Sequence, residues 1–410
     1  MKILHIVADH AEHSAGVRSV LEAMAEVMSE RGHEVTIAFT GQSQPDADRF
    51  SRTAFTRSFP KVLFYSAAMR RDLPGLVSKA DVVHVHSNWT FPVWWGCRCA
   101  KRAGKRLVHS PHGCLDPLKL RHSAWKKRLA TPFDRQAMAG ADVILAASAL
   151  EQSWIREWHP NLADRIQVIP FGIDTQQQKG SGLELQTGSA RELCAFGYDL
   201  MAKDKSAQLH GLTPFASADD SVVTDKSAQN HGLTPFALFV GRLHPLKGLD
   251  LLLEAWAQTG QAGAGWELVI AGPDEQGTRA GLEKLAQRLG IQDQVRFPGP
   301  LKKEQVLEEY HKAAFVVLPS RSENFGMVVL EALASEVPVL ATQNTPWDSL
   351  ETESCGWWVP GEVKALSEGL KKAMITPARE RQAMGRKGRA YVEQTFDWNT
   401  LAGQLEAVYR

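Results

Sequence analysis

Short β-rich segments alternate with helix-length segments along two stretches of this 410-residue chain, and this alternation limits the folds open to it. In the first stretch six segments have the composition of buried strands: 3–8, 34–39, 81–86, 106–109, 142–146 and 166–169. The second stretch has five: 237–241, 267–271, 294–297, 314–318 and 337–341. Strands separated by helices pair in parallel, so we predict an α/β protein with two doubly wound, Rossmann-like domains.

The length of the chain suits this division, because a single core rarely serves more than about 250–300 residues. We predict an N-terminal domain over 1–174, a linker over 175–236, a C-terminal domain over 237–390 and a helix over 391–410 that packs back on the N-terminal domain. Within the linker, segment 204–216 recurs as 225–237 with one change. Two copies are too few for a solenoid, which indicates a tandem duplication in a tolerant loop.

Composition excludes several classes of protein. Lys and Arg number 47 against 46 Asp and Glu, so the chain as a whole is not a polycation that seeks nucleic acid. The five cysteines are scattered without a repeated metal-ligand spacing, which argues against a disulfide framework or structural zinc. No signal-type segment and no run of about 20 apolar residues occurs. We expect a cytoplasmic protein, at most peripheral at the inner face of the plasma membrane.

The strongest motif is Ser322-Glu-Asn-Phe-Gly326, which follows the predicted strand 314–318 and leads into a predicted helix carrying Glu331. Ligands of open α/β sheets bind at the carboxyl ends of strands, and free amides at a helix start favour anions. Glu323 and Glu331 are therefore candidates to accept hydrogen bonds from ligand hydroxyls. Spacing alone equally allows Glu323 to be a helix-start charge and Glu331 a solvated face residue.

A second motif, Gly241-Arg-Leu-His-Pro-Leu-Lys-Gly248, follows the first strand of the C-terminal stretch. Arg242 and Lys247 have the chemistry to neutralise a diphosphate, Arg with a planar fork and Lys as a point charge. A basic pair in such a loop is also compatible with a plain solvent-facing role.

Two further candidates follow strands of the N-terminal stretch. Gly16 lies in His13-Ser-Ala-Gly-Val17, where glycine permits close approach of a ligand to the backbone. His112 lies in Ser110-Pro-His-Gly113 and can contact a substrate hydroxyl, help to bear charge or serve the structure alone. No Gly-x-Gly-x-x-Gly fingerprint is present, which weakens a dinucleotide site.

Five motifs thus occur in order, each after a predicted strand: the Gly16 loop, Pro-His-Gly at 111–113, Phe-Gly-Ile-Asp at 171–174, Gly-Arg-x4-Lys-Gly at 241–248 and Glu-Asn-Phe-Gly-x4-Glu at 323–331. In this order they resemble the retaining family 4 glycosyltransferases of the GT-B fold. The resemblance covers nearly the whole chain apart from the linker. It implies two domains facing across a cleft, the N-terminal one for the acceptor and the C-terminal one for a nucleotide-sugar donor.

The resemblance also implies roles for side chains. Arg242 and Lys247 would hold the donor diphosphate. Glu323 would bind hydroxyls of the donor sugar and Glu331 the ribose, while His112 would lie at the sugar ring near the reacting carbon.

Backbone groups would complete the donor site. Asn324, Phe325 and Gly326 would present amides to sugar and phosphate, with Gly16 on the opposite side. The family usually needs no metal, so we expect no cofactor besides the nucleotide diphosphate sugar itself. The one Asp-x-Asp, at 46–48, lies in a polar loop and is interpreted as a solvated turn.

Residues 98–128 form a local basic stretch, with ten Lys or Arg and one acid. Lys126, Lys127 and Arg128 are its densest part, and five aromatic residues lie in or beside it, at 89, 91, 94, 95 and 125. Aromatic residues next to basic ones suit the headgroups of an anionic membrane or a lipid-linked or anionic glycan acceptor. The alternative is a set of solvated helix faces with the tryptophans buried in the core.

We therefore expect a retaining glycosyltransferase of bacterial-type lipopolysaccharide, exopolysaccharide or other cell-surface glycan assembly. No side chain of the motifs is an obvious nucleophile, so a same-face substitution assisted by the leaving phosphate is expected. Two alternatives stay open, a sugar-nucleotide epimerase of the same fold and a catalytically inactive sugar-nucleotide-binding protein.

Overall fold

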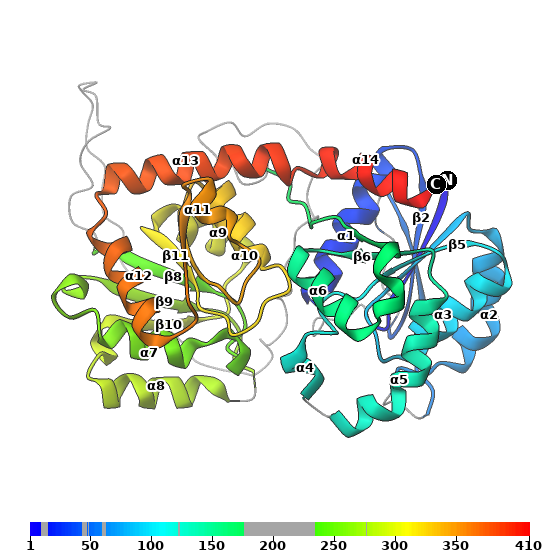
Figure 1. The fold of residues 1–410 in the computed structure, drawn as a ribbon, viewed down its shortest axis with the longest axis horizontal. Coiled ribbons are helices and arrows are strands. Elements are labelled where there is room, and N and C mark those ends of the chain that lie inside the picture. The colour runs from blue at the N-terminus through cyan, green and yellow to red at the C-terminus, as the bar shows by residue number, and fades with distance from the viewer. Residues whose placement is uncertain are drawn as a thin grey trace, which may run out of the picture.

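The structure, a computed structural model, describes residues 1–9, 15–42, 47, 49–59, 63–121, 124–175, 234–275 and 277–410. Within them the chain forms two α/β bodies side by side (Figure 1). The predicted linker with its tandem repeat falls almost entirely outside these residues, and so do both aspartates of the Asp-x-Asp motif.

The N-terminal body is a seven-stranded parallel sheet in the order β3-β2-β1-β4-β5-β6-β7. Its strands are β1 (Lys2–Ile6), β2 (Glu34–Thr40), β3 (Ser51–Phe55), β4 (Val82–His86), β5 (Arg106–Ser110), β6 (Val143–Ala146) and β7 (Ile166–Val168). Its helices are α1 (Ala15–Glu30), α2 (Ala67–Lys79), α3 (Phe91–Arg102), α4 (Pro117–Arg121), α5 (Ala124–Ala139), α6 (Ala149–Trp158) and the 3₁₀ turn η3 (Pro160–Arg165).

The C-terminal body is a six-stranded parallel sheet in the order β10-β9-β8-β11-β12-β13. Its strands are β8 (Phe236–Val240), β9 (Glu267–Ala271), β10 (Val295–Gly299), β11 (Phe315–Leu318), β12 (Val339–Thr342) and β13 (Gly356–Val359). Its helices are α7 (Leu249–Ala257), α8 (Thr278–Leu289), α9 (Lys303–Lys312), α10 (Met327–Ala334), α11 (Ser349–Thr352), α12 (Val363–Ile375) and α13 (Ala378–Thr395), with 3₁₀ turns η4 (Pro245–Lys247), η5 (Gly260–Gly263) and η6 (Gln292–Gln294).

The prediction of two doubly wound α/β domains is confirmed, with differences at the sheet edges. Sequence analysis assigned no strand to β3 or β13, which pair on one side only. β3 has the mixed sequence Ser-Arg-Thr-Ala-Phe and lacks the apolar run of a central strand. β13, Gly-Trp-Trp-Val, does carry a short apolar run, which sequence analysis did not recognise as a strand. Strand β7 was predicted as buried, but two of its three residues are exposed because it too is an edge strand.

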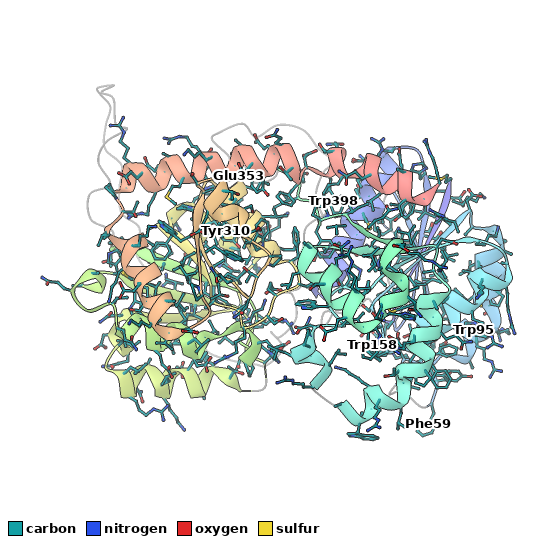
Figure 2. The ribbon with its side chains drawn as sticks, in the orientation of Figure 1. Phe59, Trp95, Trp158, Tyr310, Glu353 and Trp398 are labelled. Atoms are coloured by element: carbon teal, nitrogen blue, oxygen red, sulfur yellow. The ribbon has the colours of Figure 1, made fainter. Side chains whose placement is uncertain are left out.

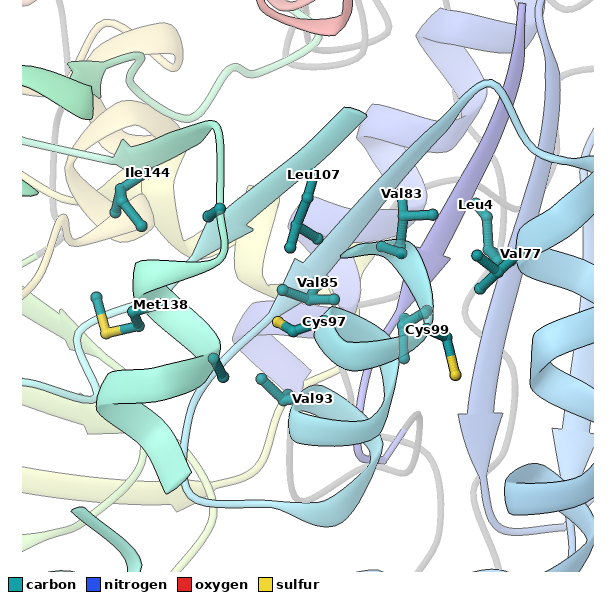
Figure 3. Close-up of a cluster of buried hydrophobic side chains, with 14 of the residues drawn as sticks. Leu4, Val77, Val83, Val85, Val93, Cys97, Cys99, Leu107, Met138 and Ile144 are labelled. Carbon is teal, nitrogen blue, oxygen red and sulfur yellow. The ribbon is translucent and has the colours of Figure 1, made fainter. Parts of the chain in front are cut away.

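The core of the N-terminal body shows why the central strands were recognisable. Val83 and Val85 of β4 and Leu107 of β5 pack against Val93 and Cys97 of α3 (Figure 3). Strands covered by helices on both faces need apolar side chains on both faces, and these are the continuous runs that the sequence shows. The described cysteines are free thiols, three of them buried, and none forms a disulfide with another described cysteine.

The end of the chain joins the two bodies. α13 runs along the C-terminal body, and α14 (Trp398–Tyr409) continues onto the N-terminal one, where the two termini lie together (Figure 1). The expected division at residue 391 falls inside α13, which packs on α10, so the passage between bodies lies at 396–398.

Trp398 shows how this passage is fixed (Figure 2). A Cβ at Gly172 would lie 2.6 Å from the Trp398 ring, and the N–H of Ile173 donates to the carbonyl of Phe396 at 2.9 Å. The glycine of the Phe-Gly-Ile-Asp motif therefore makes room for the returning C-terminal segment, and α14 adds Leu401 and Leu405 to the N-terminal core.

Candidate functional site

Two glycines bring together the loops that follow β8 and β11. Gly248 has φ of 65°, and a Cβ there would lie 2.2 Å from the carbonyl oxygen of Pro319. Gly326 has φ of 88° and is the N-cap residue just before α10, and a Cβ there would lie 3.2 Å from Cγ of Glu323. Both positions need the left-handed conformation and lack space for a side chain, so the two motif glycines are required by this close packing.

The packing of these loops places Lys247 against Glu323, which form an ion pair. The Ser320 hydroxyl donates to the same Glu323 oxygen at 3.4 Å. Burial by itself raises the pKa of Glu323, but the charge and hydrogen bond of Lys247, with the charge of Lys119, outweigh it and hold the pKa below its ordinary value. Glu323 is therefore an ionised acceptor at neutral pH.

Arg242 faces a different carboxylate. Its side chain is 54% exposed, and Nη1 donates to Glu275 Oε1 at 2.6 Å. Nearby, Arg321 makes a two-bond pair with Asp250 at 2.6 and 2.7 Å. Each of these three cationic side chains thus has a carboxylate partner, and an anion that reaches them has to replace or share it.

Glu331 lies on α10 in a less polar environment than Glu323. The hydroxyl of Tyr310, a buried residue of α9 in the middle of the C-terminal body (Figure 2), donates to Glu331 Oε2 at 2.8 Å. Burial raises the pKa of Glu331, and the Tyr310 hydrogen bond and the charge of Lys303 offset only part of this effect. The two carboxylates that spacing brought together in the sequence therefore have opposite pKa shifts.

Backbone amides at the start of α10 stay available. Among the described residues, no acceptor receives the N–H groups of Asn324, Phe325 or Gly326. Their carbonyls are engaged, since Trp347 Nε1 donates to the Phe325 carbonyl and the Ser148 hydroxyl to that of Asn324. Hydrogen bonds to the carbonyls of Asn324 and Phe325 therefore hold this backbone segment in place. The three predicted N–H donors have no acceptor among the described residues.

On the N-terminal side, His112 and Gly113 form a tight turn after β5, with φ of 53° and 69°. His112 Nε2 lies 2.8 Å from Nδ1 of His86, and its ring lies 5.6 Å from that of Phe171. Burial, with His109 and Lys119 nearby, lowers the pKa of His112 to about 3. Of the roles left open for His112, a neutral hydrogen-bonding group fits and a charge-bearing group does not.

The bodies touch at this site. The Ser148 hydroxyl donates to the Asn324 carbonyl at 2.9 Å, and that of Ser322 donates to Asp116 Oδ2 at 2.7 Å. A Cβ on Gly113 would lie 2.8 Å from Cβ of Asn324. His112 and Gly113 therefore lie beside the loop that carries Glu323.

Two polar residues of this contact were missed by sequence analysis. Lys119 Nζ donates to the Gly113 carbonyl at 3.1 Å and lowers the pKa of Glu323 across the contact. Glu151 is buried and accepts the N–H groups of Gly113 and Ala147 at 2.5 and 2.7 Å. Glu151 carried one signal, since Ser148-x-x-Glu151 is a helix-start pattern, but its partner Gly113 is remote in sequence.

Gly16 is the second residue of α1 and is exposed, while the residues before Ala15 in its loop fall outside the described ones. No described atom lies within 4 Å of the position that a Cβ would take. The described packing therefore places no demand for glycine there, unlike at Gly248 and Gly326.

The basic stretch divides in the structure. Lys126 and Arg128 on α5 are exposed, whereas Lys127 is half-buried and donates to the Lys119 carbonyl, and burial lowers its pKa. Four of the five aromatic residues pack within the N-terminal body, so of the expected aromatic surface only Trp125, 67% exposed, is present.

One group of described residues has the spacing of metal ligands: His5, His84 and His86, with nitrogens within 4.8 Å of one another in the core. None of the described helices is long and apolar enough to cross a bilayer.

Two family models match the chain. A model described as Glycosyltransferase Family 4 matches residues 14–177, and one described as Glycosyl transferases group 1 matches residues 224–391. The first covers most of the N-terminal body and the second all but the end of the C-terminal body.

Individual proteins agree with these matches. A D-inositol 3-phosphate glycosyltransferase from Thermomonospora curvata is 28% identical over 360 residues, which cover 84% of this chain and 75% of the relative. The structure of HepE from Anabaena in complex with UDP-glucose has a TM-score of 0.69 at 19% identity, over 99% of this chain and 98% of that one. WaaG, a glycosyltransferase involved in lipopolysaccharide biosynthesis, has a TM-score of 0.65 at 17% identity, over 99% and 98%. At these identities the two structures show a shared fold.

Proposed function

This chain belongs to the group 1 glycosyltransferases of family 4 and has the GT-B fold, and we propose that it transfers a sugar from a nucleoside diphosphate sugar to a hydroxyl acceptor with retention of anomeric configuration. The observation that supports this most directly is the Lys247–Glu323 ion pair. It lies at the carboxyl ends of the central strands of the C-terminal sheet, beside His112 and Lys119.

The proposed roles follow from the chemistry of each group. Arg242 and Lys247 stabilise the charge that develops on the leaving diphosphate, aided by the free amides of 324–326. Glu323, held ionised, accepts hydrogen bonds from hydroxyls of the donor sugar. Glu331 binds the ribose through the oxygen that Tyr310 does not use.

In the proposed reaction the bond from the anomeric carbon to the phosphate oxygen breaks, and the acceptor oxygen bonds to the same face. The acceptor proton passes to the leaving phosphate, which departs as the nucleoside diphosphate. No covalent glycosyl-enzyme forms, and mass spectrometry of protein incubated with donor alone checks this, because a stable adduct of one glycosyl mass would contradict the mechanism.

For the donor we propose a UDP-sugar first, since HepE has this fold with UDP-glucose bound. For the acceptor we propose an anionic or lipid-linked glycan of cell-surface assembly. One relative is named for D-inositol 3-phosphate, and WaaG is described as involved in lipopolysaccharide biosynthesis. Lys119 places a cation at the contact on the acceptor side.

The test is a screen of purified protein against UDP-, GDP- and ADP-sugars, with phosphorylated and lipid-linked acceptors. We expect nucleotide release that requires an acceptor. NMR of the product should show the same anomeric configuration as in the donor. Conversion of the donor without any acceptor would identify an epimerase. Donor binding without turnover on every acceptor would identify an inactive binding protein.

We propose in addition that helix α5 docks on an anionic membrane surface at the cytoplasmic side. Trp125, Leu129 and Phe133 are 67%, 70% and 58% exposed and recur every four residues, so they lie on one face of the helix. Lys126 and Arg128 are exposed beside them. Apolar anchors next to cations match an anionic lipid surface, where each cation contributes about 1 kcal/mol.

The vesicle experiment uses two charge-matched variants. Lys126→Glu with Arg128→Glu is expected to weaken sedimentation with phosphatidylserine vesicles at least 10-fold, as removal of about 2 kcal/mol requires. Lys364→Glu with Lys372→Glu makes the same charge change at exposed positions of α12 and is expected to bind like the parent. Equal loss of vesicle binding in both variants would show that net charge alone causes the binding, and would contradict docking through α5.

A further inference from the structure

A line of three histidines runs from the N-terminal core to the site. His5 of β1 and His86 of β4 are joined by a 2.9 Å contact between Nδ1 and Nε2, and His86 Nδ1 lies 2.8 Å from His112 Nε2. The ring centroids of both pairs are 5.1 Å apart. The neighbouring strands β1, β4 and β5 pair in parallel, which places these side chains at successive positions toward the carboxyl edge of the sheet.

The close spacing of His5, His84 and His86 is better explained by hydrogen bonds than by a metal ion. His84 Nδ1 lies 2.9 Å from the Tyr409 hydroxyl and its Nε2 lies 2.8 Å from the Ser110 hydroxyl. In the group His5, His84 and His86, every ring nitrogen except Nε2 of His5 therefore has a hydrogen-bond partner. A metal ion would have to displace several of these bonds and would bring an uncompensated charge into the core.

The number of protons on the three rings limits the direction of the hydrogen bonds between them. Burial keeps all three rings neutral, since it lowers the pKa of His5 and His112 to about 3 and that of His86 well below its ordinary value. A neutral imidazole carries one N–H, so two consecutive hydrogen bonds must point the same way along the line. Either each ring donates outward, toward His112, or each donates inward, toward His5.

The inner end decides between the two directions. His5 Nε2 is buried and has no hydrogen-bond partner among the described residues. Inward polarity would put a proton on this nitrogen and leave a buried N–H without an acceptor, which folded proteins rarely tolerate. Outward polarity leaves the proton of His5 on Nδ1, that of His86 on Nδ1 and that of His112 on Nδ1.

We propose that His5 and His86 are positioning residues that fix His112 as the Nδ1–H tautomer, so that His112 offers a neutral hydrogen-bond donor to an oxygen of the bound donor. The inference rests on the proposed glycosyl transfer for its last step. Nδ1 of His112 makes no hydrogen bond to the described residues, and its ring lies beside Phe171, which in turn contacts Phe325 at 5.1 Å. A donor fixed before the ligand arrives needs no reorganisation during the reaction.

The first test needs no substrate and is therefore independent of the proposed function. Long-range ¹H–¹⁵N spectra of ¹⁵N-histidine-labelled full-length protein distinguish protonated from unprotonated ring nitrogens, with His112→Gln to assign the resonance. We expect a proton on Nδ1 and a bare Nε2 at His112 in the parent, and a tautomer mixture after His86→Phe. A parent His112 protonated on Nε2, or an unchanged tautomer in His86→Phe, overturns the proposal.

The second test is kinetic and has a matched control. His86→Phe is expected to lower kcat about 10-fold with little change in donor KM, the size of effect seen when an orienting partner is lost. His86→Asn keeps a donor near the Nδ1 position and should recover part of this loss. His84→Gln alters a neighbouring buried imidazole outside the line and should leave kcat near the parent value.

Thermal unfolding separates folding from positioning. If His86→Phe does not fold, the tautomer measured in the parent and the kcat of His86→Asn still decide the matter. A kcat of His84→Gln as low as that of His86→Phe would show a general effect of core imidazoles and contradict the proposal.

Discussion

The two sides of the site hold their polar groups by opposite means. The C-terminal side relies on charges in loops, Lys247 with Glu323 and the half-exposed Arg242 with Glu275. The N-terminal side relies on the neutral imidazole of His112, bonded to a buried line of histidines. The Arg242–Glu275 pair is partly exposed, and exposed ion pairs contribute little and exchange partners easily. A buried polar network is rigid because each unpaired group is costly.

This difference suggests a division of labour. In the proposed reaction Arg242 can release Glu275 when phosphates arrive and take it back when the product leaves. The buried side cannot rearrange at low cost, so in the proposed reaction it fixes the position of His112 relative to the donor sugar. Lys119 is the exception, a single cation of the N-terminal side whose charge reaches Glu323.

The largest effect is expected at Glu323, the charged residue that we propose binds the donor sugar. Glu323→Gln keeps the size of the side chain and removes its charge, and we expect kcat to fall by about 10²–10³-fold, the loss typical of one oriented polar group at a reacting centre. Steady-state kinetics of Glu331→Gln provide the comparison, with a raised donor KM and a smaller change in kcat. The reverse pattern would exchange the roles of the two carboxylates.

A second variant tests whether Lys247 controls the ionisation of Glu323. In Lys247→Met, burial acts on Glu323 without its main opposing charge, so its pKa rises. Because activity requires the ionised carboxylate, the acidic limb of the kcat profile moves to higher pH. Donor KM should rise about 10- to 100-fold, as for loss of one charged hydrogen bond worth about 1.5–3 kcal/mol.

Arg242→Met is the control for this pH effect. Its guanidinium pairs with Glu275 and not with Glu323, so donor KM should rise while the acidic limb stays in place. Equal displacement of the limb in both variants would show that the total charge of the loops, and not the Lys247 contact, sets the pKa.

How far sequence could predict this site depends on whether the place of a side chain follows from the order of the strands. The loops of Lys247 and Glu323 follow strands that are apolar throughout, so their place at one sheet edge was predictable. Lys119 acts on Glu323 across the contact between bodies, and Glu151 accepts the Gly113 N–H beside it. Neither contact joins two loops that follow neighbouring strands of one sheet, because Glu323 follows a strand of the other sheet and Glu151 lies within α6. The strand pattern therefore did not predict them. Residue type did not distinguish the exposed Trp125 from the packed Trp94, because helix rotation and neighbours decide exposure.

The smallest effect concerns the contact between the two sides, and glycine provides a clean comparison. Gly113 and Gly104 have φ of 69° and 62°, so alanine costs about 1–2 kcal/mol of backbone strain at either position. A Cβ at 113 would lie 2.8 Å from Asn324, whereas none of the described atoms lies within 4 Å of one at 104.

Both alanine variants should lose similar thermal stability, but only Gly113→Ala should lose activity, by about 10-fold. Misplacement by an ångström far from the chemistry can cost still more. Small-angle scattering with donor bound should then show Gly113→Ala more open than Gly104→Ala. If the two variants keep equal kcat, the approach of Asn324 to Gly113 is not part of the working geometry, and the N-terminal side positions the sugar without this contact.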